Sequence, residues 1–181
     1  DGYFDALSVK AIWVSPWQTQ PAGAFADGSH SVSGYHGYWP VKARDVDARY
    51  GGKAALKSLV LEAHKHGIRI VMDAVLNHVH IEHEYFQDPA KKSWFRTGCT
   101  CGSSDACGWD NAAVTCLFRD YMPDINWTNN DAADQFVDDL VSTARSSGTE
   151  RAKRAADVLA AWDRQAETTS TGMLLFHKFM L

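Results

Sequence analysis

The chain has 181 residues, of which 45% are hydrophobic and 22% charged, so it can bury a substantial core and is not disordered throughout. Its formal net charge of −4 and its sequence pI near 6.0 argue against a nucleic-acid-binding protein, because such proteins carry a basic stripe and this chain has none. No apolar run approaches the ~20 residues that a membrane-spanning helix needs, so we expect no membrane partner.

The first residues predict the end of a helix followed by a strand. Residues 3–8 are typical of a helix end, and the apolar run at residues 9–15 is typical of a strand that Pro16 ends. Residues 15–38 are rich in Gly, Ser and His and are expected to form a long loop with an ordered aromatic end.

A helix and a second strand follow this loop. The apolar residues in 53–66 recur at helical spacing, and Gly67 supplies the left-handed residue that stops the helix. The β-branched run at 68–72 predicts a strand buried on both faces. The order strand, helix, strand predicts a βαβ unit with a parallel sheet and a right-handed crossover.

Three polar residues follow the second strand within six positions: Asp73, Asn77 and His78. Polar groups at the carboxyl ends of parallel strands lie where α/β barrels place their ligands and chemistry. The alternative is a buried Asp73 held by a neighbouring Arg, with Asn77 and His78 in an ordinary loop.

More than 40 residues then separate His78 from the next predicted helix, which is too long for a βα loop and indicates a small inserted subdomain. It holds all four cysteines, whose even number and tight clustering favour disulfides and an oxidising compartment, with three pairings open. A zinc knot is the alternative. Four His and Glu residues lie close together at 80–84: His80, Glu82, His83 and Glu84. They lack the His-Glu-x-x-His spacing of a zinc site, so we expect this segment to be a solvated loop.

The C-terminal part contains one clear helix pattern at residues 131–141, with Asn129 or Asn130 as its cap. Residues 150–167 are rich in Ala and Arg and can form another helix. The sequence from residue 142 onward otherwise shows no strand pattern, and we place no element in 168–181.

Segments of the chain, in order, resemble conserved motifs of the α-amylase family, glycoside hydrolase family 13. Val9-Lys-Ala-Ile-Trp-Val-Ser-Pro16 looks like the second barrel strand of that family, and Gly34-Tyr-His-Gly-Tyr-Trp-Pro40 looks like its substrate wall. Asp73-Ala-Val-Leu-Asn-His78 looks like the motif after its third strand, and Met122-Pro-Asp-Ile-Asn126 like a motif in its inserted domain B. The resemblance extends from Gly2 to about Val141.

This resemblance implies an α/β fold: a fragment of a (β/α)8 TIM barrel, from the region of strands 2 and 3, with an inserted Cys-rich domain B. The expected ranges are a partial barrel at 1–78, domain B at 79–126 and a returning helix at 127–141. Residues 142–181 are expected to be an atypical tail, either frame-shifted or disordered.

The resemblance also implies a binding site for α-1,4-glucans such as starch, glycogen or maltooligosaccharides. Tyr38 would stack on a sugar ring and His78 would hydrogen-bond it, while His36 and Trp39 would line the site. Asp73 would brace the carboxyl end of the barrel.

The resemblance further implies a calcium ion bound by Asn77 and Asp124, since carboxylate and amide oxygens suit that cation. The residues alone favour the other interpretation, in which Asp124 is a turn residue after Pro123. The cysteine cluster and the family together imply a secreted protein, extracellular or periplasmic.

A retaining glycosidase needs two carboxyl groups about 5 Å apart. In this family the nucleophile follows the fourth strand in a Gly-x-Arg-x-Asp pattern, which is absent after Val141. We therefore assign no catalytic residue here and expect a fragment that is inactive and poorly stable alone. The alternatives are a non-catalytic amylase-like glucan-binding protein and, less favoured, a cysteine-rich zinc module.

Overall fold

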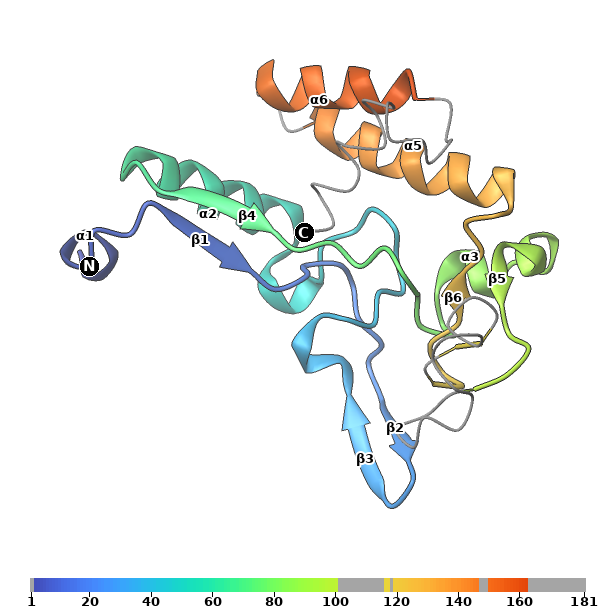
Figure 1. Ribbon diagram of the computed structural model, residues 1–181. Helices are drawn as coiled ribbons and strands as arrows, with labels where there is room; N and C mark the ends of the chain where they lie inside the picture. Colours follow the sequence, from blue (N-terminus) through green and yellow to red (C-terminus); the bar gives the residue numbers. More distant parts are fainter. Residues whose placement is uncertain (1, 101–115, 118, 147–149, 163–181) are drawn as a thin grey trace. The chain divides into compact units, whose positions relative to one another are not determined.

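The computed structural model describes residues 2–100, 116–117, 119–146 and 150–162. The chain divides into two compact units, residues 1–75 and residues 76–181. Figure 1 shows the elements of each unit, coloured along the sequence.

The first unit is built on a parallel βαβ arrangement. After the short helix α1 (Tyr3–Ala6), strand β1 (Ala11–Val14) pairs in parallel with β4 (Arg69–Met72), and helix α2 (Gly52–Lys65) precedes β4 in the chain. Helix α2 ends before Gly67, whose φ of 68° is the left-handed conformation that glycine adopts readily. The predicted helix, both strands and their parallel pairing are confirmed.

The prediction that the second strand is buried on both faces is wrong. Ile68 is buried just before β4, but Val71 is 48% exposed and Trp13 of β1 is 66% exposed. The reason is that β1 and β4 form a two-stranded sheet, and Figure 1 shows α2 running along it. Apolar side chains are thus left in contact with water, which supports the expectation of low stability for the chain alone.

A β-hairpin replaces part of the loop expected at residues 15–38. Strand β2 (Ala24–Asp27) pairs antiparallel with β3 (His30–Ser33). Gly28 has a φ of 62° in the connection, as tight hairpin turns require. Two short 3₁₀ helices follow in the first unit, η1 (Gly34–His36) and η2 (Ala48–Tyr50).

Asp47 is a buried carboxylate that ties Gln20 to the segment that contains Asp47 and Arg49. It accepts hydrogen bonds from the Gln20 backbone N–H at 3.0 Å and from the Arg49 N–H at 2.9 Å. The Arg49 guanidinium donates to the same carboxylate through Nε at 2.9 Å and Nη2 at 2.6 Å. These bonds, with the Arg49 guanidinium as the largest cause, lower the pKa of Asp47 to about 2.

Replacing Asp47 with Ala is expected to destabilise the first unit by about 2 kcal/mol at pH 7, because buried N–H groups lose their acceptor. The pKa of Asp47 is 3.8 in the unfolded chain and about 2 in the folded one. The stabilisation that the ionised carboxylate gives the folded state is therefore complete above pH 3.8 and is lost as the pH falls towards 2. Urea unfolding at pH 7 and pH 3 measures both effects. Asp45→Asn, on an exposed carboxylate, is the control, and an equal loss in both variants would contradict the assignment.

The second unit has a short antiparallel ladder and a compact apolar core. Helix α3 (Glu84–Gln87) and 3₁₀ helix η3 (Pro89–Trp94) lead into strand β5 (Phe95–Arg96), which pairs with β6 (Asp124–Ile125). The buried core of this region consists of Val79, Phe95, Ile125 and Phe136. Its centre therefore joins residues that lie more than 40 positions apart in the sequence.

Two helices complete the described part of the second unit. Helix α5 (Asn130–Ser146) begins after Asn129, whose side-chain oxygen accepts a hydrogen bond from the Ala132 N–H at 3.1 Å, as a cap does. Helix α6 (Glu150–Ala160) packs on α5 through a second buried cluster: Val137, Val141, Ala156 and Leu159. The described residues of the predicted atypical tail are thus largely helical, and 163–181 lie outside the described residues.

Cys99 and Cys116 form a disulfide. These two side chains are therefore not available as zinc ligands, which supports the disulfide interpretation for this pair. Cys101 and Cys107 lie outside the described residues.

Candidate functional site: an aromatic wall and a buried carboxylate

The predicted wall residues lie together in the first unit because the chain turns sharply at Gly37. Gly37 has a φ of 90°, and a Cβ at this position would lie 2.4 Å from the Pro16 carbonyl oxygen, so only glycine fits. The Trp39 N–H donates to the Gln20 side-chain oxygen at 2.7 Å, and Trp39 itself is buried. This anchoring leaves Tyr38 on the surface, 41% exposed.

His36 supports Tyr38 from one side. Its Nδ1 accepts a hydrogen bond from the Tyr38 N–H at 3.0 Å, and the two rings stack with centroids 5.7 Å apart. Trp39 meets the His36 ring edge-on at 5.1 Å. Burial lowers the pKa of His36, so the ring is neutral near pH 7 with its proton on Nε2, the nitrogen left to act as a donor.

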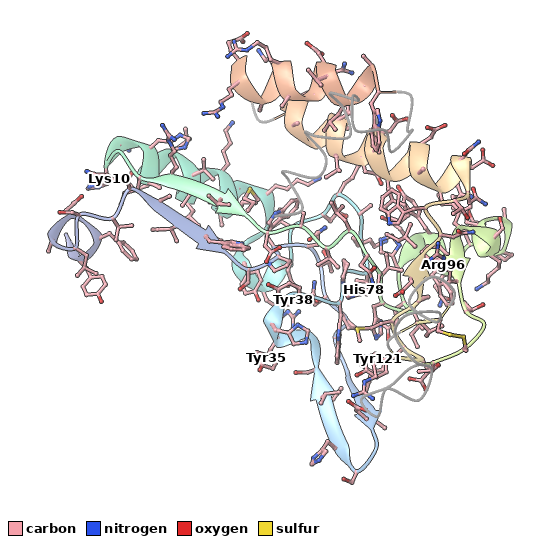
Figure 2. The ribbon with its side chains drawn as sticks, viewed as in Figure 1. Lys10, Tyr35, Tyr38, His78, Arg96 and Tyr121 are labelled. Atoms are coloured by element: carbon pink, nitrogen blue, oxygen red, sulfur yellow. A yellow bond between two sulfur atoms is a disulfide. The ribbon has the colours of Figure 1, made fainter. Side chains whose placement is uncertain are left out.

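Asp73 contacts the wall directly. The Tyr38 hydroxyl donates to Asp73 Oδ2 at 2.6 Å. Asp73 is the first residue after β4, and its N–H donates to the Val14 carbonyl at 3.1 Å. Figure 2 labels Tyr38 and Tyr35 and shows both side chains near η1. The sequence did not indicate this contact, because Tyr38 and Asp73 are 35 positions apart and their pairing depends on tertiary structure.

The wall offers two kinds of contact that a sugar ring uses. The exposed ring of Tyr38 can stack on the C–H face of a pyranose, and the Nε2–H of His36 can donate to a hydroxyl.

Asn77 and Asp124 lie together in the second unit because their backbones pair. The Ile125 N–H donates to the Asn77 carbonyl at 2.8 Å, and the Val79 N–H donates to the Pro123 carbonyl at 3.1 Å. The Asn77 Nδ2 lies 3.2 Å from Asp124 Oδ1. Asp124 is 9% exposed, and its burial raises the pKa of the carboxyl to about 6.

The donor set fits a hard cation in part. Asp124 offers a carboxylate that is shielded from water. Asn77 can present its side-chain oxygen to a cation when its amide group is rotated. Within the described residues no group of three or more His, Cys, Asp or Glu gathers around a metal site. Backbone carbonyls and water would supply the other ligands.

His78 lies between these residues in the paired segment. It forms a β-bridge with Asp124 and is half-buried, and Figure 2 labels its side chain. The structure thus groups the predicted residues into two sets. Tyr38, His36, Trp39 and Asp73 belong to the first unit; Asn77, His78 and Asp124 belong to the second.

The expectation of a solvated loop at residues 80–84 is wrong for its histidines. His80 and His83 are 0% and 1% exposed. Burial lowers the pKa of His80 to about 4, and His83 Nδ1 accepts from the Tyr85 N–H at the start of α3. Both rings are structural because they pack among aromatic side chains, a placement that local polarity does not reveal.

A family model described as "Alpha amylase, catalytic domain" matches residues 2–145. The chain belongs to the α-amylase family. The relatives of this amylase-family chain include an oligo-1,6-glucosidase of Saccharomyces cerevisiae, with 33% identity over 99 residues. The matched region covers 51% of this chain and 15% of the relative. A periplasmic α-amylase of Escherichia coli is 38% identical over 79 residues, covering 42% of the chain and 12% of the relative.

Solved amylase structures share the fold. An α-amylase from Geobacillus thermoleovorans, solved in complex with acarbose, matches with a TM-score of 0.65 and 26% identity over 80% of this chain and 29% of that one. An Anoxybacillus α-amylase matches with a TM-score of 0.65 and 27% identity. The amylase-family chain therefore adopts part of the TIM-barrel amylase fold. It spans 29% of these two solved chains and 15% or less of the two curated relatives named above.

None of the described helices is both long and apolar enough to cross a membrane.

Proposed function

We propose that this chain is part of an α-amylase-type glycoside hydrolase that acts on α-1,4-glucans by a retaining mechanism. The observation that carries the proposal is the exposed Tyr38 ring held on a wall of His36 and Trp39, in a chain of this family. Tyr38 would stack on the sugar and His36 would donate to a hydroxyl. His78, in the second unit, is proposed separately as a sugar contact, as the family resemblance implies.

We also propose that the chain corresponds to strands 2 and 3 of the barrel and the inserted domain B, with the ranges 1–78, 79–126 and 127–141. Calcium is the proposed cofactor, with Asp124 and Asn77 among its ligands. The ion would neutralise the buried carboxylate and hold residues 77–79 to 123–125. A secreted or periplasmic location fits the disulfide between Cys99 and Cys116.

The polypeptide itself is proposed to bind glucans without cleaving them. Its sequence has no Gly-x-Arg-x-Asp pattern after Val141, and we assign neither nucleophile nor acid/base to any residue present. A non-catalytic, amylase-like glucan-binding protein is the alternative, and the same missing pattern favours it.

Replacing Tyr38 with Ala is expected to weaken binding of maltoheptaose by about tenfold or more, because the stacking surface is removed. Isothermal titration calorimetry on the full chain measures this. Tyr50→Ala, on another exposed tyrosine of the first unit, is the matched control. Unchanged affinity in Tyr38→Ala, or no binding by the unsubstituted chain, would refute the proposed sugar site.

A further inference from the structure

The Tyr38 side chain is constrained at three points although it is largely exposed. Its N–H is bonded to His36 Nδ1, one face of its ring stacks on the same imidazole, and its hydroxyl donates to Asp73. A solvent-exposed tyrosine ordinarily samples several rotamers and loses that freedom when a ligand binds. Here the three contacts restrict the ring before any ligand arrives.

The bond between Tyr38 and Asp73 has a second chemical consequence. A phenol carries one proton, and at 2.6 Å from a carboxylate oxygen that proton is committed to Asp73. The Tyr38 oxygen therefore faces a ligand only as a hydrogen-bond acceptor. Asp73 is itself fixed by its N–H bond to the Val14 carbonyl at the end of β1, so the constraint reaches back into the parallel sheet.

We propose that Asp73 is a positioning residue that acts through Tyr38: its carboxylate fixes the stacking ring and makes the Tyr38 oxygen an acceptor for a sugar hydroxyl. This role is more specific than bracing the end of a strand, and it rests on the proposed function. The ligand that fits is a pyranose that presents a C–H face to the ring and a hydroxyl donor at its edge.

The test is a double-mutant cycle on the full chain with maltoheptaose as the probe. Asp73→Ala and Tyr38→Phe are each expected to weaken binding by about tenfold, because each removes the same charge-assisted hydrogen bond. The double variant is expected to bind no more weakly than the weaker single variant. Asp73→Asn keeps an acceptor without the charge and should restore part of the affinity. Tyr35→Phe and Asp45→Asn are controls that should bind normally.

A second readout detects the contact without any ligand. NMR titration of the Tyr38 phenol carbon in the free chain is expected to show a pKa above the ordinary value that falls back in Asp73→Ala. Circular dichroism shows whether Asp73→Ala keeps the native fold. If Asp73 had only a structural role, a variant that keeps the native fold would show no change in the Tyr38 titration. A phenol titration that is the same in both proteins would overturn the proposal.

The outcomes separate this proposal from the function on which it rests. If the unsubstituted chain binds maltoheptaose and Asp73→Ala binds equally well, or if the two single losses add in the double variant, the positioning role is refuted and the sugar site stands. If the unsubstituted chain does not bind maltoheptaose, the proposed function and the positioning role both fail, even with the phenol titration intact.

Discussion

Leu159→Ala is expected to lower the free energy of unfolding of the second unit by about 3 kcal/mol. Leu159 is 1% exposed and lies in the cluster that joins α6 to α5, so the shortened side chain leaves a cavity that these two helices cannot easily close. Urea unfolding followed by far-ultraviolet circular dichroism measures the change. This substitution also tests whether residues 150–160 belong to the fold.

Leu61→Ala provides the matched control, because it makes the same chemical change on the exposed surface of a helix. We expect it to cost less than about 0.5 kcal/mol. If Leu159→Ala cost no more than Leu61→Ala, the packing of α6 on α5 would be contradicted, and the expectation of a disordered tail would extend to these residues.

Calcium at a hundredfold excess over its dissociation constant is expected to stabilise the second unit by about 2.7 kcal/mol, which raises its melting temperature by about 10–20 °C. The physical reason is that the cation would compensate the buried charge of Asp124, whose pKa is raised by burial. Differential scanning calorimetry with calcium and with EDTA measures the shift. Asp124→Asn is expected to abolish it.

Asp131→Asn is the control for this experiment, since Asp131 is an exposed carboxylate in the first turn of α5. It should keep the full response to calcium. Without calcium, Asp124→Asn should be at least as stable as the unsubstituted chain at pH 7, because it removes a buried charge. A calcium response that survives in Asp124→Asn would exclude Asp124 as a ligand.

The sequence predicted the elements whose signals are local. The apolar spacing and the terminal Gly67 identified α2, and the apolar run and Pro16 identified β1. The parallel pairing followed from the helix between two strands. The sequence offered Asn129 or Asn130 as the cap of α5, and in the structure the Asn129 side chain takes this role.

Features that depend on tertiary contacts were missed. The burial of His80 and His83 among aromatic rings, and the bond between Tyr38 and Asp73, join residues through the folded chain rather than through sequence spacing. The exposure of Val71 was mispredicted because a β-branched run indicates a strand but does not show how many neighbours cover it. The β2–β3 hairpin did have a local signal, the Gly28-Ser29 pair with glycine at the first turn position, within a stretch interpreted as a loop.

We propose that this polypeptide binds glucans on the wall formed by Tyr38, His36 and Trp39 and does not cleave them. Incubating the full chain with end-labelled maltoheptaose, and measuring bound and cleaved sugar in the same sample, tests it most directly. The predicted result is saturable binding that Tyr38→Ala weakens, with all of the label recovered in uncleaved heptasaccharide. Release of shorter labelled oligosaccharides that Tyr38→Ala abolishes would contradict it.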